Sequence, residues 1–146
     1  MTDEATFLDL SAELTGFALF DLIATGLTEL YFTTAVADIG PETWRRLFDA
    51  WHDIARDLPP ADRPAAIADR IMAVPALADA AQRIIALWYV GSWYSVLPGG
   101  SQVVSATAYV EGLMWKAIGS HPMGAKPQGY AAWATNPPLP AAGENR

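Results

Sequence analysis

The feature that most constrains the fold is the stretch PETWRRLFDAWHDIARDL at residues 41–58. Its apolar side chains recur at a spacing of three or four residues, which places them on one face of an α-helix. This stripe consists of Trp44, Leu47, Phe48, Trp51, Ile54, Ala55 and Leu58. Polar residues, His52 among them, occupy the opposite face. Pro41 suits the first turn of a helix and Pro59 with Pro60 ends it, so the sequence predicts an amphipathic helix packed on a core.

Helical periodicity continues on both sides of this stretch. We expect further helices over residues 2–16, 21–37, 62–73, 76–94 and 106–118. The second of these is apolar on more than one face, which predicts a central position, and its Gly26 would allow a close helix approach. QVVSATAY at residues 102–109 could form a strand by itself, but the sequence offers it no second strand. The predicted fold is therefore all-α, a compact bundle of five or six helices.

The chain has 146 residues, of which 52% are hydrophobic, enough for one domain with a core. We divide it into a helical domain at residues 1–121 and an extended C-terminal arm at residues 122–146. The arm is rich in Gly and Pro, which disfavour a helix. We expect its residues 122–140 to lie along a partner and to be ordered by it.

Composition excludes several classes of protein. The formal net charge of −7 and the sequence pI of about 4.6 disfavour binding to nucleic acid or to an anionic membrane, because phosphate recognition depends on clustered Lys and Arg. The chain contains no Cys, which excludes disulfides, thiolate-held iron–sulfur clusters and c-type haem attachment in this chain. Asp21 and Glu29 interrupt the apolar run at residues 17–39, so we interpret that run as buried and not as transmembrane.

The sequence shows no arrangement typical of catalysis or cofactor binding. His52 and His121 lie far apart, and the segments PGGS and GSHPMG lack the glycine spacing of a dinucleotide loop or a P-loop. There is no G-x-S-x-G motif. The carboxylates that fit solvated helix faces and caps are Glu13, Asp38, Asp49, Asp57 and Asp62. We therefore predict no catalytic, cofactor-binding or metal-ligating residue in this chain.

Charge is sparse in residues 84–143, where the charged residues are Glu111, Lys116 and Lys126. The same region holds a concentration of large aromatic side chains, namely Trp88, Tyr89, Trp93, Tyr94, Tyr109, Trp115, Tyr130 and Trp133. The predicted helix at residues 106–118 is apolar on two faces. Either all these aromatics serve the core of this domain, or one face packs on the bundle and the other contacts a partner protein.

Three segments of this region, ALWYVGSWY, AYVEGLMWKAIGSHPMG and GYAAW followed by NPP, resemble a known family. It is the small-subunit family of bacterial membrane-bound, FAD-dependent sugar dehydrogenases, which includes the small subunits of sorbitol and fructose dehydrogenases and the gamma subunit of the FAD-dependent glucose dehydrogenase. FLDLSAELTG at residues 7–16 also resembles the family's opening F-x-x-L-S-x-x-L-T-G. The resemblance covers about residues 6–138, and its short motifs are specific through their order and spacing.

The resemblance implies a non-catalytic subunit that holds no cofactor itself. It would stabilise, fold and help to mature a large subunit of the glucose–methanol–choline type, which holds FAD, often with an iron–sulfur cluster, and oxidises a sugar or polyol. A multihaem cytochrome c subunit would carry the electrons on to quinone. Carried over onto this chain, the expected partner contacts are Trp88, Tyr89, Trp93, Tyr109, Glu111, Met114, Trp115, Tyr130 and Trp133.

The resemblance also implies export, because the family's small subunit usually carries a twin-arginine signal. The start MTDEATFLDL is acidic, and the pair Arg45 and Arg46 lies inside the amphipathic helix, so such a signal is missing here. We expect a periplasmic complex at the inner membrane if a signal has been removed, and a cytoplasmic one otherwise. The substrate is chosen by the large subunit and is not indicated by this sequence.

Two other functions stay open from the sequence. The first is a stand-alone helical binding module with an aromatic pocket for an apolar ligand such as a quinone; a pocket enclosed by Trp88, Trp93 and Trp115 would favour it. The second is an enzyme in its own right, for which no nucleophile or acid–base arrangement is evident.

Overall fold

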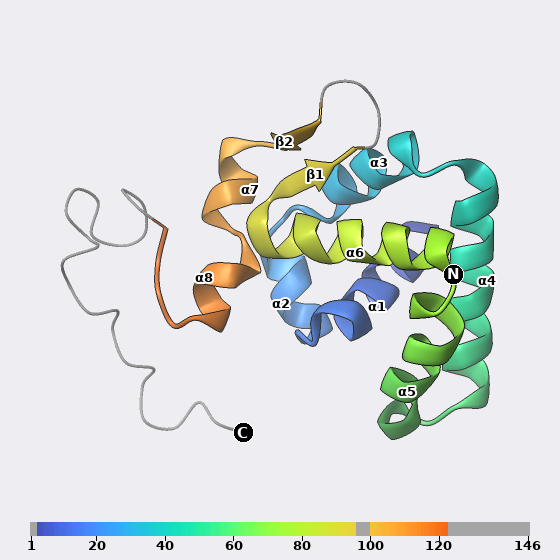
Figure 1. The fold of residues 1–146 in the computed structure, drawn as a ribbon. Helices are drawn as coiled ribbons and strands as arrows, with labels where there is room; N and C mark the ends of the chain where they lie inside the picture. The colour runs from blue at the N-terminus through green and yellow to red at the C-terminus, as the bar shows by residue number, and fades with distance from the viewer. Residues whose placement is uncertain (1–2, 96–99, 123–146) are drawn as a thin grey trace, which may run out of the picture.

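The computed structural model describes residues 3–95 and 100–122, and Figure 1 shows their arrangement. In chain order the elements are α1 (Asp3–Thr15), α2 (Leu19–Ala24), α3 (Thr28–Asp38), α4 (Pro41–Asp57), the 3-10 turn η1 (Pro60–Asp62), α5 (Arg63–Ile67), the π-helical turn η2 (Ala68–Met72), α6 (Pro75–Val90), β1 (Ser92–Tyr94), β2 (Ser101–Val103), α7 (Ala106–Val110) and α8 (Leu113–Ala117). Helices dominate, so the predicted all-α class is confirmed, with a small two-stranded hairpin added to it.

Helix α6 crosses the middle of the fold and contacts α1, α3, α4 and α8. In Figure 1, α4 runs along one side of the molecule, while α7 and α8 lie on the opposite side. The Trp88 ring of α6 is buried; it stacks on Phe7 of α1 with centroids 6.3 Å apart and meets Tyr31 of α3 in a T-shaped contact at 4.8 Å. Helix α6 therefore joins the amino-terminal and carboxy-terminal helices into one core.

The predicted stripe of α4 is confirmed as a core-facing surface. Its buried members are Trp44, Leu47, Phe48, Trp51 and Ile54, while Ala55 and Leu58 are half-buried against the core. The indole Nε1 of Trp51 donates to Asp9 Oδ2 of α1 at 3.2 Å, so this large ring is buried with its polar atom satisfied. Pro41 is the first residue of the helix, as predicted.

The predicted helix at residues 21–37 is broken into α2 and α3, so that prediction was wrong at its middle. Gly26 has φ 69°, a left-handed conformation that favours glycine and ends the first helix. The Thr25 hydroxyl donates to the Leu22 carbonyl at 2.7 Å and accepts from the Leu27 N–H at 3.2 Å, which closes the turn. A Cβ at Gly26 would meet nothing within 4 Å, so the predicted close helix approach is also wrong.

The expectation that residues 102–109 lack a partner strand was wrong too. Helix α6 ends at Val90, and after Gly91, which has a left-handed φ of 66°, the chain continues into β1, where the sequence predicts helix. β1 pairs antiparallel with β2, with Trp93 opposite Gln102. The strand at residues 101–103 was recognisable in part, but its partner at residues 92–94 continues the helical pattern of α6, so the pairing could not be predicted.

The predicted helix at residues 106–118 is two short helices, α7 and α8. The chain divides at Gly112, where a Cβ would lie 2.7 Å from the Tyr89 carbonyl oxygen of α6. Glycine at this position lets the turn between α7 and α8 press against the end of α6. The Ser105 hydroxyl caps α7 by accepting from the Ala108 N–H at 2.9 Å. The two apolar faces expected of one helix are therefore distributed over two.

The predicted C-terminal arm at residues 122–146 lies outside the described residues except for residue 122. Two of the expected partner contacts, Tyr130 and Trp133, fall in that part of the chain.

Candidate partner interface

Large apolar side chains are exposed on four parts of the described chain. They are Leu19, Phe20 and Ile23 on α2, Leu30 and Val36 on α3, Tyr94 and Val103 on the hairpin, and Tyr109 and Ile118 on or next to α7 and α8. Phe20 is the most exposed of them at 78%, followed by Ile118 at 63%. Isolated apolar residues on a surface are ordinary, whereas several of them close together make a candidate surface for association.

Helices α2 and α8 lie side by side at one end of the molecule, opposite α4 (Figure 1). An ion pair between Lys116 of α8 and Asp21 of α2 joins them, and the Lys116 ammonium lies 5.9 Å from the centroid of the Phe17 ring. We call the exposed apolar residues of this region the α2–α8 edge; they are Leu19, Phe20, Ile23 and Ile118. The edge combines four exposed apolar side chains with one bridging charge pair.

Tyr109 and Trp115 form a pair next to the α2–α8 edge. Their rings make a T-shaped contact with centroids 5.5 Å apart, and Trp115 Nε1 donates to the Tyr109 carbonyl oxygen at 2.9 Å. Tyr109 is 39% exposed and Trp115 is half-buried. Since the polar atom of the Trp115 indole is already bonded within the chain, the part of Trp115 left for other contacts is apolar ring.

Tyr89, Glu111 and Met114 are half-buried. The Tyr89 hydroxyl donates to the Thr15 carbonyl at 2.8 Å, which ties the end of α6 to the end of α1. Burial, and secondarily the nearby Glu111 carboxylate, raises the pKa of the Tyr31 hydroxyl well above its ordinary value. Glu111 therefore acts on the core of this chain in addition to any contact it makes outside.

Trp88 and Trp93, two of the expected partner contacts, lie in the core, with 1% and 3% of their surfaces exposed. The Trp93 indole Nε1 donates to Asp38 Oδ2 at 3.0 Å, and the Arg83 guanidinium lies 5.9 Å from the centroid of its ring. Neither tryptophan offers a face to a partner in this arrangement. The structure thus separates the seven described members of the predicted set into core, half-buried and exposed residues, which the sequence did not distinguish.

Asp38 was predicted as a solvated carboxylate, and that prediction was wrong. Its side chain is 10% exposed and pairs with the equally buried Arg83, Oδ2 to Nη1, at 2.8 Å. It also accepts from Trp93 Nε1 and, through Oδ1, from the Ser95 hydroxyl at 3.0 Å. The carboxylate fastens the β1 end of the hairpin to α3 and α6. Glu13 likewise is mostly buried, with Arg63 at 3.1 Å.

The α2–α8 edge is the part of the site that sequence reasoning missed. The signal was present in part, because the predicted helix at residues 21–37 was recognised as apolar on more than one face. We interpreted that pattern as a central position with neighbours on several sides, which is wrong for α2, where Phe20 and Ile23 are exposed. A helix also has apolar residues on two faces when one face packs on the core and the other binds a partner protein.

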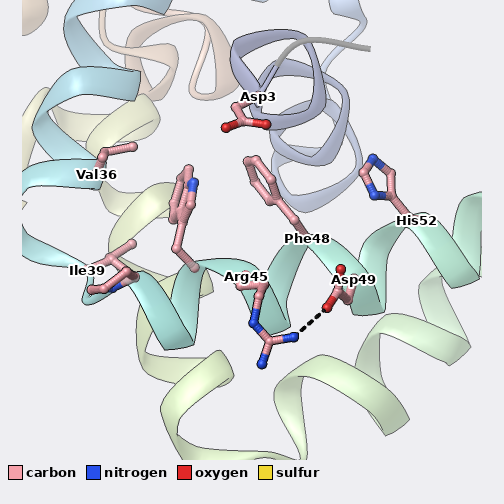
Figure 2. A pocket seen from close by; sticks show the side chains of 9 residues that line it. Asp3, Val36, Ile39, Arg45, Phe48, Asp49 and His52 are labelled. Atoms are coloured by element: carbon pink, nitrogen blue, oxygen red, sulfur yellow. Dashed lines mark hydrogen bonds and ion pairs between the residues drawn. The ribbon is translucent and has the colours of Figure 1, made fainter.

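Two hollows lie elsewhere on the described surface. One, of about 360 Å³, is lined by α4 with parts of α1 and α3, and Figure 2 shows it. The other, of about 380 Å³, lies between α6 and the hairpin and is lined by Asp79, Gln82, Arg83, Tyr94, Ser95 and Ser101. Neither is lined by Trp88, Trp93 or Trp115, the residues of the pocket considered for an apolar ligand.

Within residues 3–95 and 100–122 there is no group of three or more His, Cys, Asp or Glu side chains arranged to hold a metal ion. His52 is exposed on α4, and its Nε2 lies 3.3 Å from the Thr6 hydroxyl. No helix in the same residues is long and apolar enough to cross a membrane.

No family model, curated protein or solved structure matches this chain. The function is therefore inferred from the surface described above and from the motifs in the sequence.

Proposed function

We propose that this chain is the non-catalytic small subunit of an FAD-dependent sugar or polyol dehydrogenase complex. It stabilises, folds and helps to mature the FAD-containing large subunit, of the glucose–methanol–choline type, which performs the oxidation. The flavin, and an iron–sulfur cluster where there is one, belong to that large subunit. A cytochrome c subunit accepts the electrons, and the complex works at the periplasmic face of the inner membrane if a signal has been removed, and in the cytoplasm otherwise.

The observation that carries this proposal is the α2–α8 edge. Phe20, Ile23 and Ile118 each leave more than half of their surface exposed, which a domain that functions alone has no reason to keep in water. Aromatic and aliphatic anchors surrounded by a few charges are typical of the centre of a protein interface. Tyr109 and Trp115 extend this surface, and the resemblance of their segment to the small-subunit family supports the same assignment.

The interface we propose consists of the edge together with the half-buried and exposed members of the predicted set, which are Tyr89, Tyr109, Glu111, Met114 and Trp115. Tyr130 and Trp133, outside the described residues, stay predicted contacts. Trp88 and Trp93 are left out because they are enclosed by the core of this chain.

The proposal expects a flavoprotein of the glucose–methanol–choline type to be encoded beside this chain, and it is tested by expressing that flavoprotein with and without the chain. We expect a yellow complex of the two proteins, and a large subunit that is less soluble and poorer in FAD when the chain is omitted. A stable, monomeric chain that leaves the yield and the FAD content of the large subunit unchanged would contradict the proposal. Turnover by the purified chain alone would instead establish an enzyme.

A further inference from the structure

The hollow in Figure 2 is a groove with an aromatic floor on α4, which we call the α1–α4 groove. Trp44, Phe48 and His52 succeed one another at every fourth residue, with centroids 4.6 Å and then 6.4 Å apart. Val36 and Ile39 form one wall. The groove has about 360 Å³, room for one long side chain, and it lies on the side of the molecule opposite the α2–α8 edge.

The charges around the α1–α4 groove are unbalanced. Arg45 also lines the groove, but its side chain points away from Asp3 in Figure 2. It pairs with Glu42 at 2.9 Å and with Asp49 at 3.2 Å, so two carboxylates offset its positive charge. Asp3 stands across from the Phe48 ring, and no Lys or Arg of residues 3–95 and 100–122 forms an ion pair with it. Within the part of the chain that the structure describes, the groove therefore presents aromatic rings and a carboxylate that no Lys or Arg pairs with.

The chain itself shows what completes such an arrangement. Arg63 lies 5.7 Å from the Trp51 ring centroid while it pairs with Glu13, and Arg83 lies 5.9 Å from the Trp93 ring while it pairs with Asp38. In both cases an arginine is held between an aromatic ring and a carboxylate, and Lys116 makes the same kind of arrangement with Phe17 and Asp21. The α1–α4 groove has the ring and the carboxylate without the arginine.

We propose that the α1–α4 groove binds an arginine side chain presented by a segment of a partner protein. The aliphatic stem of the arginine would lie along Val36 and Ile39, and the guanidinium would contact Phe48 and pair with Asp3. Arginine suits this position better than lysine because its planar, weakly hydrated group both packs on rings and binds a carboxylate. The proposal does not depend on the identity of the large subunit, because the groove and the α2–α8 edge are separate surfaces.

The test uses the full chain and two peptides, acetyl-Gly-Ala-Arg-Ala-Gly-amide and the same peptide with citrulline, which is uncharged but nearly the same shape as arginine. Binding is followed by the NMR shifts of the Trp44 indole N–H and of the backbone amides of α4. We expect saturable shifts at the groove with the arginine peptide, and about tenfold weaker binding of the citrulline peptide, from the lost ion pair and cation–π contact.

Asp3→Asn is the variant that tests the charge, since asparagine is also tolerated at a helix start. Asp3→Asn should lower the affinity for the arginine peptide about threefold to fivefold, which is the effect expected from losing an exposed ion pair. Asp69→Asn removes an exposed carboxylate outside the groove and should leave the affinity unchanged. Equal binding of the two peptides, no saturable shift at α4, or equal effects of Asp3→Asn and Asp69→Asn would each overturn the proposal. None of these outcomes bears on assembly through the α2–α8 edge, so the arginine site and the proposed function can be refuted independently.

Discussion

Replacing Asp38 by alanine removes the acceptor shared by Arg83, Trp93 and Ser95. Breaking a buried ion pair by removing one partner costs about 3–5 kcal/mol, because a charge stays buried without compensation. In Asp38→Ala, Arg83 still pairs with Asp79, which makes the loss of stability smaller. The buried Trp93 indole loses its acceptor, which makes the loss of stability larger. We therefore expect Asp38→Ala to lower the free energy of unfolding by about 3 kcal/mol.

Asp79→Ala is the matched control, since it removes the other carboxylate of the same Arg83. The Asp79 side chain is 55% exposed against 10% for Asp38, so its loss should cost only about 0.5 kcal/mol. Urea unfolding measures both values, and amide exchange of Val104, whose N–H bonds to the Gly91 carbonyl, reports on the hairpin. Exchange at Val104 should be faster in Asp38→Ala than in Asp79→Ala. Equal destabilisation by the two variants would refute the view that buried Asp38 holds the hairpin in place.

The remaining predictions concern three aromatic residues, Trp51, Trp115 and Tyr31. Trp51→Ala should lower the free energy of unfolding by about 3–5 kcal/mol in a urea titration, because Trp51 is 1% exposed; a loss below about 1 kcal/mol would contradict its place in the core. Trp115→Ala should destabilise the isolated chain by only about 1 kcal/mol but weaken the complex by about 2 kcal/mol in a binding titration, so equal losses would favour a purely internal role. The Tyr31 hydroxyl is buried without a partner among the described residues, so Tyr31→Phe should raise stability by about 1 kcal/mol, whereas a loss of that size would indicate a bonded hydroxyl. Because its pKa is raised, Tyr31 keeps its proton in the folded chain above pH 10, where the unfolded chain loses it; stability should fall as pH rises past 10, and less steeply in Tyr31→Phe.

The sequence predicted a helix most accurately where its apolar periodicity and the residues at its ends indicated the same boundaries. The stripe of α4 has a strong apolar face and proline at both ends, and α1 (Asp3–Thr15) lies within the helix predicted over residues 2–16. Predictions failed at Gly26, Gly91 and Gly112. Glycine inside an apolar run is compatible with a close contact, a left-handed turn or a continued helix, and tertiary packing selects among these.

The candidate site could be predicted as a region, but its individual residues could not. The sequence placed an aromatic, weakly charged surface around Tyr109 and Trp115, and both are at least partly exposed. The same pattern covered Trp88 and Trp93, whose burial depends on contacts with α1 and α3 far away in sequence. Phe20 was missed because the apolar run at residues 17–39 was interpreted as buried. Residue type shows that a side chain is apolar, and the fold decides whether it meets the core or a partner.

The affinity of the chain for its large subunit after a change in the α2–α8 edge tests the central claim most directly. Phe20→Ser should weaken the complex about 30-fold, because about 2 kcal/mol is expected for an aromatic anchor, and should leave the fold intact, because Phe20 is 78% exposed. Arg46→Ala, an exposed change on α4 at the opposite side, is the control and should bind as the unmodified chain does. If Phe20→Ser and Arg46→Ala bind the large subunit equally well, or if the unmodified chain does not bind it, the account is contradicted.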